Sequence, residues 1–214
     1  MLNRRQRQMC IRDRILPLAE TSMNVAILIS GRGSNMVALA KAIAAPDYPA
    51  RVVGVISDNA DAGGLLLAQE LGIETTALPR ADYDSKAAHE AAIQKQLEAW
   101  DAEIVCLAGY MRLFSAQFIE KWPARFINIH PSLLPKFKGL NTHQRVLGAG
   151  DPEHGSTVHY VTAGMDEGPV IAQARIEVQD GDTVDTLTDR VLIEEHKLYP
   201  MALRKLIDAF LAKQ

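Results

Sequence analysis

The sequence predicts an α/β protein with a mostly parallel central sheet, helices on both faces and an antiparallel edge. Short apolar runs alternate with helical segments between residues 23 and 130, the pattern of a doubly wound parallel sheet. Two later segments alternate with period two and lie close in sequence, so we expect them to pair antiparallel. With 214 residues, 48% of them hydrophobic, the chain can bury one sizeable core. One Rossmann-like domain is therefore expected.

Glycine turns and helices separate the first three predicted strands. Residues 24–30 (NVAILIS) form a nearly continuous apolar run, typical of a strand buried on both faces. A glycine-containing turn and an alanine-rich helix follow, the helix over residues 36–45. Next come a strand over residues 51–57, a helix over 62–71 that ends at Gly72, and a weaker strand over 73–78.

The second half of the alternating strands and helices ends at a proline-rich segment. Asp84 and Ser85 can cap a helix that reaches about Trp100, with an apolar stripe formed by Ala88, Ala92, Ile93 and Leu97. A fourth strand over residues 103–108, a short helix near 116–121 and a fifth strand over 126–129 complete this part.

The last third of the chain changes pattern. Residues 155–161 and 169–178 are the predicted antiparallel pair, placed at one sheet edge. The final segment, residues 183–213, is helical, and we expect a break at Pro200.

Charge and composition exclude several classes of protein. Residues 1–22 contain five of the 23 basic residues and two of the 26 acidic ones, so the remainder has a net charge of −6. Such an acidic body argues against nucleic-acid binding. Two cysteines, Cys10 and Cys106, are too few for a disulfide framework, and no apolar stretch approaches the length of a membrane helix. We therefore expect a soluble, cytoplasmic protein, a monomer or homodimer.

Residues 1–22 differ from the rest. They are rich in arginine, lack hydrophobic periodicity and precede a second methionine, Met23. We interpret them as a non-native or disordered extension, with a domain over residues 23–214. A transit peptide is the alternative, although serines are few.

The first candidate site is the turn SGRGSN, residues 30–35. Its glycines allow a tight turn, and the amides of Gly33, Ser34 and Asn35 would lie at a helix N-terminus, which favours a phosphate. The dinucleotide fingerprint requires a third glycine where Met36 stands, although Asp58 could imitate its ribose-binding acid. A monophosphate fits better, and a turn without a ligand is the third possibility.

The second candidate is FINIHPSLLPKFKG, residues 126–139, where a strand ends beside prolines. Asn128 and His130 are two apart, so both face one side of the strand and could stabilise an oxyanion together. A structural strand end is the alternative. Asp166 lies in the turn after Thr162; it is either a solvated turn acid or a partner that keeps a histidine protonated. The spacings of His143, His154 and His159 match no compact zinc pattern, so no metal is expected.

Several motifs together resemble the phosphoribosylglycinamide formyltransferase family. They are MNVAILISGRGSN, LAGYMRLFS, NIHPSLLPKFKG, GSTVHYVTAGMDEGPVI and EEHKLYP, in order from Met23 onward. The resemblance implies a formyltransferase fold and an enzyme of purine synthesis. That enzyme transfers a formyl group from 10-formyltetrahydrofolate to the amine of a small phosphorylated substrate, glycinamide ribonucleotide, without metal.

The resemblance also implies roles for individual residues. Asn128, His130 and Asp166 match the catalytic trio, and Gly33, Ser34 and Asn35 match the phosphate loop. The ribose and glycinamide part would contact Leu192, Ile193, Glu194 and Glu195. The folate would contact Asn128 and Asp166 together with Lys86, Met111, Arg112, Leu113, Phe114, Thr162, Ala163, Gly164 and Met165.

One departure and three alternatives accompany this resemblance. Asn141 stands in GLNTH where many members have a histidine, and we expect this difference to alter the rate or its pH dependence. Methionyl-tRNA formyltransferase and formyltetrahydrofolate deformylase are similar around Asn128 and His130 but carry additional domains. A non-catalytic Rossmann-type nucleotide-binding protein would use only the glycine turn.

Overall fold

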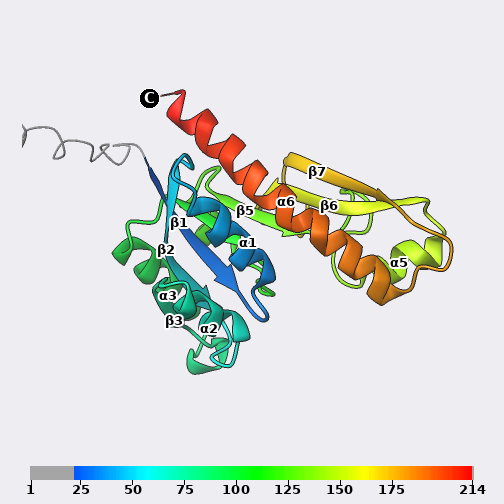
Figure 1. The fold of residues 1–214 in the computed structure, drawn as a ribbon. Coiled ribbons are helices and arrows are strands. Elements are labelled where there is room, and N and C mark those ends of the chain that lie inside the picture. The colour runs from blue at the N-terminus through cyan, green and yellow to red at the C-terminus, as the bar shows by residue number, and fades with distance from the viewer. Residues whose placement is uncertain (1–21, 214) are drawn as a thin grey trace, which may run out of the picture.

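The computed structural model describes residues 22–213, so the extension predicted for residues 1–22 lies outside the described residues except for Ser22. Seven strands form one sheet in the order β3-β2-β1-β4-β5-β6-β7. The first five strands are parallel to one another and the last two are antiparallel to their neighbours. The predicted fold class is confirmed (Figure 1).

The strands lie within a few residues of their predicted positions. The parallel ones are β1 (Met23–Ile29), β2 (Ala50–Ser57), β3 (Thr75–Ala77), β4 (Ile104–Leu107) and β5 (Phe126–His130). The antiparallel pair consists of β6 (Glu153–Tyr160) and β7 (Val170–Glu177), and β7 forms the sheet edge as expected.

The helices include one that the sequence did not predict. The predicted ones are α1 (Ser34–Ile43), α2 (Gly63–Glu70), α3 (Lys86–Ala99), α4 (Ala116–Ile119) and α6 (Val184–Leu211). A single 3₁₀ turn covers Arg80–Asp82. The additional helix, α5 (Thr142–Ala149), follows the proline-rich segment and packs Val146 against Leu187 and Val191 of α6.

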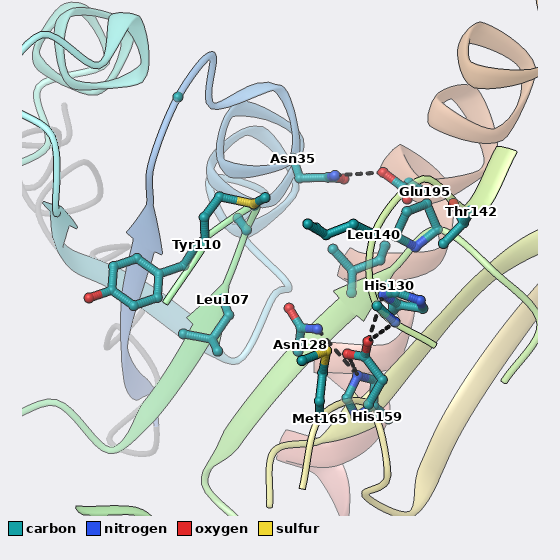
Figure 2. A pocket seen from close by; sticks show the side chains of 18 of the residues that line it. Asn35, Leu107, Tyr110, Asn128, His130, Leu140, Thr142, His159, Met165 and Glu195 are labelled. Atoms are coloured by element: carbon teal, nitrogen blue, oxygen red, sulfur yellow. Dashed lines mark hydrogen bonds and ion pairs between the residues drawn. The ribbon is translucent and has the colours of Figure 1, made fainter. Parts of the chain in front are cut away.

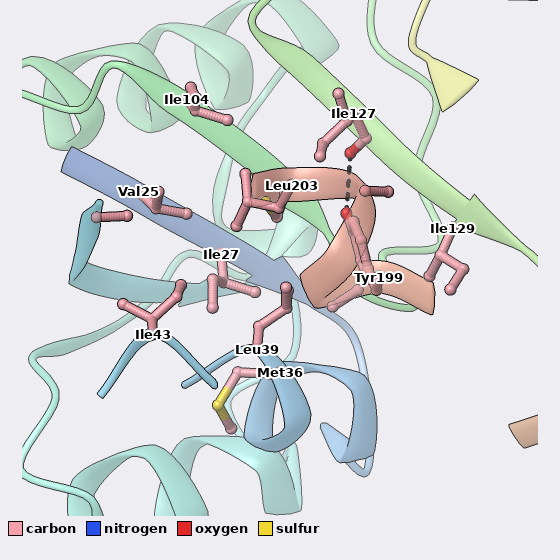
Figure 3. Close-up of a cluster of buried hydrophobic side chains, with 14 of the residues drawn as sticks. Val25, Ile27, Met36, Leu39, Ile43, Ile104, Ile127, Ile129, Tyr199 and Leu203 are labelled. Carbon is pink, nitrogen blue, oxygen red and sulfur yellow. Dashed lines mark hydrogen bonds between the residues drawn. The ribbon is translucent and has the colours of Figure 1, made fainter. Parts of the chain in front are cut away.

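Two hydrophobic clusters cover the two faces of the sheet because alternate residues of each strand point to opposite faces. On one face, side chains of β1 pack against α1, α2 and α6. Figure 3 shows this cluster, with Val25, Ile27, Met36, Leu39, Ile43, Tyr199 and Leu203. On the other face, Ala26 and Leu28 meet α3 and a group of aromatic rings, namely Phe114, Phe118, Trp122 and Phe126. The central strands β1 and β4 are thus buried on both sides, as their apolar sequences predict.

The predicted break at Pro200 is wrong, because α6 continues through it from residue 184 to 211. Proline lacks the N–H that would bond one turn back, which disfavours the helix locally. Packing offsets this cost, since Tyr199, Ala202 and Leu203 are buried in the core. The carbonyl of Pro200 also accepts a hydrogen bond from the Tyr48 hydroxyl at 2.7 Å.

The predicted stripe of α3 is partly wrong. Ser85 caps this helix as expected, accepting from the Ala88 amide at 3.0 Å, but Ala88 itself is exposed. His89 and Glu90 are buried in its place beside Ile93 and Leu97. Hydrogen bonds compensate their polarity: the His89 ring bonds the Leu78 carbonyl at 2.8 Å, and Glu90 accepts from the Ser115 amide at 2.7 Å.

Two further observations concern Cys106 and membranes. Cys106 is fully buried in β4, and burial raises the pKa of its thiol to about 12, so it is not a nucleophile at neutral pH. Within residues 22–213, none of the helices combines the length and the apolar character needed to cross a membrane.

Candidate active site

A cavity of about 740 Å³ opens at the carboxyl ends of the parallel strands. The strand order places β1 beside β4, and the chain proceeds from β1 to β2 on one side and from β4 to β5 on the other. Such a switch point leaves a crevice between the two loops, where ligands bind in open α/β sheets. The loops after β1, β4 and β5, the turn between β6 and β7, and α6 all contribute to the walls.

The SGRGSN segment forms the expected glycine turn at the start of α1. Gly33 is left-handed, with a φ of 75°, and a Cβ there would lie 2.7 Å from the Cα of Gly64. The first turn of α1 has no acidic residue and no side-chain cap, so its N–H groups remain available to an anion. Met36 is buried where the dinucleotide fingerprint needs glycine.

Asp58, the other support for a dinucleotide, is already paired. Its carboxylate accepts from the Arg112 guanidinium at 2.7 Å, so it anchors the loop after β4. The geometry therefore favours the monophosphate interpretation over the dinucleotide.

Helix α6 reaches the same end of the cavity. Asn35 donates to the buried Glu195 carboxylate at 2.7 Å, and the Asn35 oxygen is buried with no partner among the described residues (Figure 2). Burial raises the pKa of Glu195, and the Asn35 hydrogen bond partly counteracts this. Leu192 also lines the cavity, whereas Ile193 and Glu194 do not, because successive helical residues turn away by about 100°.

Asn128, His130 and Asp166 come together, as the sequence alone could not show. The His130 Nδ1 lies 3.4 Å from the Asp166 Oδ2, and its Nε2 lies 3.1 Å from the Phe137 carbonyl oxygen. The Gly139 amide donates to the same Asp166 oxygen at 2.8 Å. Asn128 and His130 project from β5 to the same side, as their spacing predicted, and both line the cavity.

His159 completes this group, although we predicted no role for it. It lies on β6 directly opposite Asn128, and it is 2% exposed. The Asn128 Nδ2 is 3.2 Å from its Nε2, and the Tyr160 carbonyl oxygen is 2.9 Å from its Nδ1. Burial lowers the pKa of His159.

The remaining predicted residues divide into two groups. Met111, Arg112, Leu113, Phe114, Thr162, Gly164 and Met165 line the cavity, and the side chains of Met111, Leu113 and Met165 form an exposed apolar rim together with Leu140. Lys86 and Ala163 do not line it. Lys86 instead lies at the start of α3, 3.8 Å from Glu90.

A family model described as formyl transferase matches residues 23–203. The chain belongs to this family. The phosphoribosylglycinamide formyltransferase of Escherichia coli (strain K12) is 42% identical over 181 residues, which cover 85% of each chain. A bovine protein named trifunctional purine biosynthetic protein adenosine-3 is 47% identical over 180 residues, 84% of this chain but only 18% of that protein. The chain thus spans less than a fifth of that trifunctional relative and most of the bacterial one.

Solved structures of other formyltransferases are also similar to this chain in fold and in sequence. The crystal structure of phosphoribosylglycinamide formyltransferase from Brucella melitensis has a TM-score of 0.84 and 54% identity, covering 87% of this chain and 96% of that one. Glycinamide ribonucleotide transformylase 1 from Symbiobacterium toebii has a TM-score of 0.86 and 44% identity, covering 89% and 90%.

Two of the histidines considered above as metal ligands, His143 and His154, are paired with each other. The His154 Nε2 and the His143 Nδ1 are 2.9 Å apart, and Asn141 begins α5 in a left-handed conformation at the cavity wall. Over residues 22–213, no group of three or more His, Cys, Asp or Glu side chains has an arrangement suited to a metal ion.

Proposed function

We propose that this chain transfers the formyl group of 10-formyltetrahydrofolate to the amine of N1-(5-phospho-D-ribosyl)glycinamide, a step of purine biosynthesis. The observation that carries the proposal is the meeting of Asn128, His130 and Asp166 in one cavity, between a phosphate-type turn and an apolar rim. Its support from relatives is the 85% mutual coverage with a bacterial enzyme named for this activity.

The turn at the start of α1 binds the phosphate of the substrate. The amides of Gly33, Ser34 and Asn35 supply donors, and the helix dipole favours the negative charge. Leu192 and Glu195 of α6 then face the ribose and glycinamide part from the neighbouring wall. The unpartnered Asn35 oxygen, buried here, can accept a hydrogen bond from that part of the substrate.

The apolar rim binds the pterin of the formyl donor. Side chains of Met111, Leu113, Leu140 and Met165 are between 47% and 69% exposed, which is a large apolar area for a ligand to cover. Thr162 and Gly164 supply polar groups on the facing wall, and Arg112 is held in place by Asp58.

Attack of the neutral amine on the formyl carbon develops negative charge on the formyl oxygen and positive charge on the nitrogen. Asn128 and His130 stabilise the oxygen, a contribution of roughly 3 to 4 kcal/mol per donor in measured cases. Both His130 nitrogens face protein oxygens, so the ring gives up the contact of its Nε2 to the Phe137 carbonyl to reach the substrate and keeps the 3.4 Å contact of its Nδ1 to Asp166. Asp166 stabilises the positive ring and, through a water, takes the amine proton and passes it to the leaving folate nitrogen as the bond between that nitrogen and the formyl carbon breaks.

The test follows the absorbance change as 10-formyl-5,8-dideazafolate is consumed by the full chain, with and without glycinamide ribonucleotide. Consumption that requires the ribonucleotide supports the proposal. Hydrolysis without it identifies a deformylase, and formation of formylmethionyl-tRNA in a parallel assay identifies the tRNA enzyme. Absence of consumption in every arm leaves a binding protein. Sedimentation at equilibrium then tests the prediction of a monomer or homodimer.

A further inference from the structure

We propose that His159 is a positioning residue for formyl transfer, because its Nε2 accepts a hydrogen bond that fixes the amide of Asn128 for catalysis. This inference rests on the proposed function, in which Asn128 is an oxyanion donor. The sequence resemblance assigned His159 no role.

The fold places the His159 ring beside Asn128 and Asp166. Residues Asn128 and His159 are register partners in the antiparallel pair of β5 and β6, so their side chains share one face of the sheet. His159 is 2% exposed, yet its side chain borders the cavity. Its ring is therefore held by packing and has little freedom to turn.

The hydrogen bonds of His159 determine which ring nitrogen carries the proton. The Tyr160 carbonyl, 2.9 Å from Nδ1, can only accept, so Nδ1 must be protonated. Burial lowers the pKa of the ring, with Asp166 acting in the opposite direction and His130 in the same one. A neutral ring with a proton on Nδ1 leaves a lone pair on Nε2.

This lone pair orients Asn128. Only the Nδ2 of the amide can donate to it, across 3.2 Å, since the amide oxygen would face it as a second acceptor. Figure 2 shows the Asn128 nitrogen directed at His159 and its oxygen turned away. One N–H is thus used by His159, and the second N–H of the same nitrogen remains for the formyl oxygen. Without His159, nothing in the described contacts of Asn128 would prevent the amide from rotating.

The same lone pair leaves one oxygen of Asp166 open. The Asp166 Oδ1 lies 3.7 Å from the His159 Nε2, which has no proton to give it. The two shorter contacts of this carboxylate, from the Gly139 amide at 2.8 Å and the His130 Nδ1 at 3.4 Å, both go to Oδ2. The arrangement therefore reserves Oδ1 as an acceptor for the water that carries the amine proton.

Two amide substitutions separate the roles of the two ring nitrogens. His159→Gln places an acceptor near the position of Nε2, whereas His159→Asn places its amide near Nδ1 and leaves the Nε2 position empty. We expect kcat to fall at least about tenfold in His159→Asn and less than about fivefold in His159→Gln, with KM for both substrates within about twofold of wild type. Melting temperatures of both variants show whether they fold.

A double-mutant comparison excludes a merely structural effect. In an Asn128→Ala background, measured by single turnover, His159→Asn should cost less than about twofold because the group it positions is gone. An equal loss in both backgrounds, equal kcat values for the two amides, or a change confined to KM would overturn the inference. Wild-type activity that depends on glycinamide ribonucleotide is measured alongside; its absence would count against the proposed function and not against the placement of His159.

Discussion

The two oxygens of Asp166 have different surroundings, and this asymmetry suits the catalytic role that we propose for Asp166. Asp166 has a positive φ of 53°, which aspartate tolerates better than most residues, and the turn directs its carboxylate back toward Gly139 and His130. Oδ2 holds the turn and the histidine in place, and Oδ1 faces a lone pair. A single side chain can therefore fix geometry with one atom and move a proton with the other.

The first prediction concerns this carboxylate. Asp166→Asn keeps an acceptor for the Gly139 amide but removes the charge, so we expect kcat to fall at least about 100-fold. Binding of glycinamide ribonucleotide, measured by calorimetry, should change less than about threefold because the phosphate turn lies on α1. The control is Glu167→Gln, the neighbouring exposed acid paired with Lys138 at 2.9 Å, which should retain wild-type kcat. A kcat within about threefold of wild type in Asp166→Asn would contradict the role.

At the residue scale, the sequence predicts which side chains of one strand share a face. It does not predict which residues of different elements come into contact. Asn128 and His130 were predictable together because residues two apart share a face. The proximity of Asp166, 36 residues further on, depends on where the turn after β6 returns, which no local pattern encodes. His159 was missed because its importance depends on pairing opposite Asn128; a buried histidine in an apolar period-two segment was the available signal.

At the scale of elements, the turn proposed to bind the phosphate depends on two glycines, the N-cap of α1 (Gly33) and Gly64 of α2. The left-handed Gly33 packs against Gly64 at the start of α2, and the Gly64 amide donates to the Gly31 carbonyl at 3.0 Å. The N-terminus of α1 is thereby held against α2, with its amides directed to the cavity.

The second prediction tests this contact. Gly33→Ala forces a Cβ to within 2.7 Å of the Gly64 Cα and adds a left-handed penalty of about 1 to 2 kcal/mol. We expect KM for glycinamide ribonucleotide to rise at least about tenfold and the melting temperature to fall by about 4 °C or more. Gly63→Ala is the matched control, because its Cβ would meet nothing within 4 Å; it should leave KM unchanged. Equal KM values in the two variants would refute the importance of the contact.

Two features of the fold were not predicted or were predicted wrongly. Their local sequence patterns are weak, or tertiary packing outweighs the local pattern. Helix α5 has only two larger apolar residues, Val146 and Leu147, and ends among glycines, so its periodicity is poor. Its stability comes from packing of Val146 on α6. At Pro200 the local signal for a break was strong, but burial of the surrounding turn overrides it.

At the scale of the whole molecule, α6 connects the core to the cavity. The buried Tyr199 hydroxyl lies 3.1 Å from the carbonyl oxygens of both Leu107, the last residue of β4, and Ile127, the second residue of β5. Figure 3 shows the contact with Ile127. One turn earlier, Glu195 meets Asn35 of α1. The same helix therefore fixes the spacing of two strands below the site and closes one wall of it. Alternating strands and helices predicted this layered fold, but the strand order that creates the switch point is a tertiary outcome and was not predictable.

The last prediction concerns acid stability and the pair formed by His154 and His143. Burial, and then the neighbouring His143, lower the pKa of His154 to about 4, while Asp151 acts in the opposite direction. An unfolded chain binds this proton near the ordinary value of 6.5, so between these values the unfolded state holds more protons than the folded one. Above pH 6.5 this residue therefore does not reduce the free energy of unfolding, and as the pH decreases toward 4 the free energy of unfolding falls. By pH 5 the loss from this residue is roughly 2 kcal/mol.

Urea denaturation at pH 7 and pH 5 measures this loss. His154→Gln removes the titrating group while its side-chain amide can still donate to the His143 Nδ1, so the difference between the two pH values should shrink by roughly 2 kcal/mol. His196→Gln is the control: its ring is only half-buried, its pKa is lowered by burial alone, and a smaller change is expected. If both variants keep the pH dependence of the wild type, the acid instability arises from other residues. The buried pair of histidines then does not lower the free energy of unfolding at pH 5. The expected result would instead assign this part of the acid sensitivity of the fold to the buried pair, of which His143 lines one wall of the cavity.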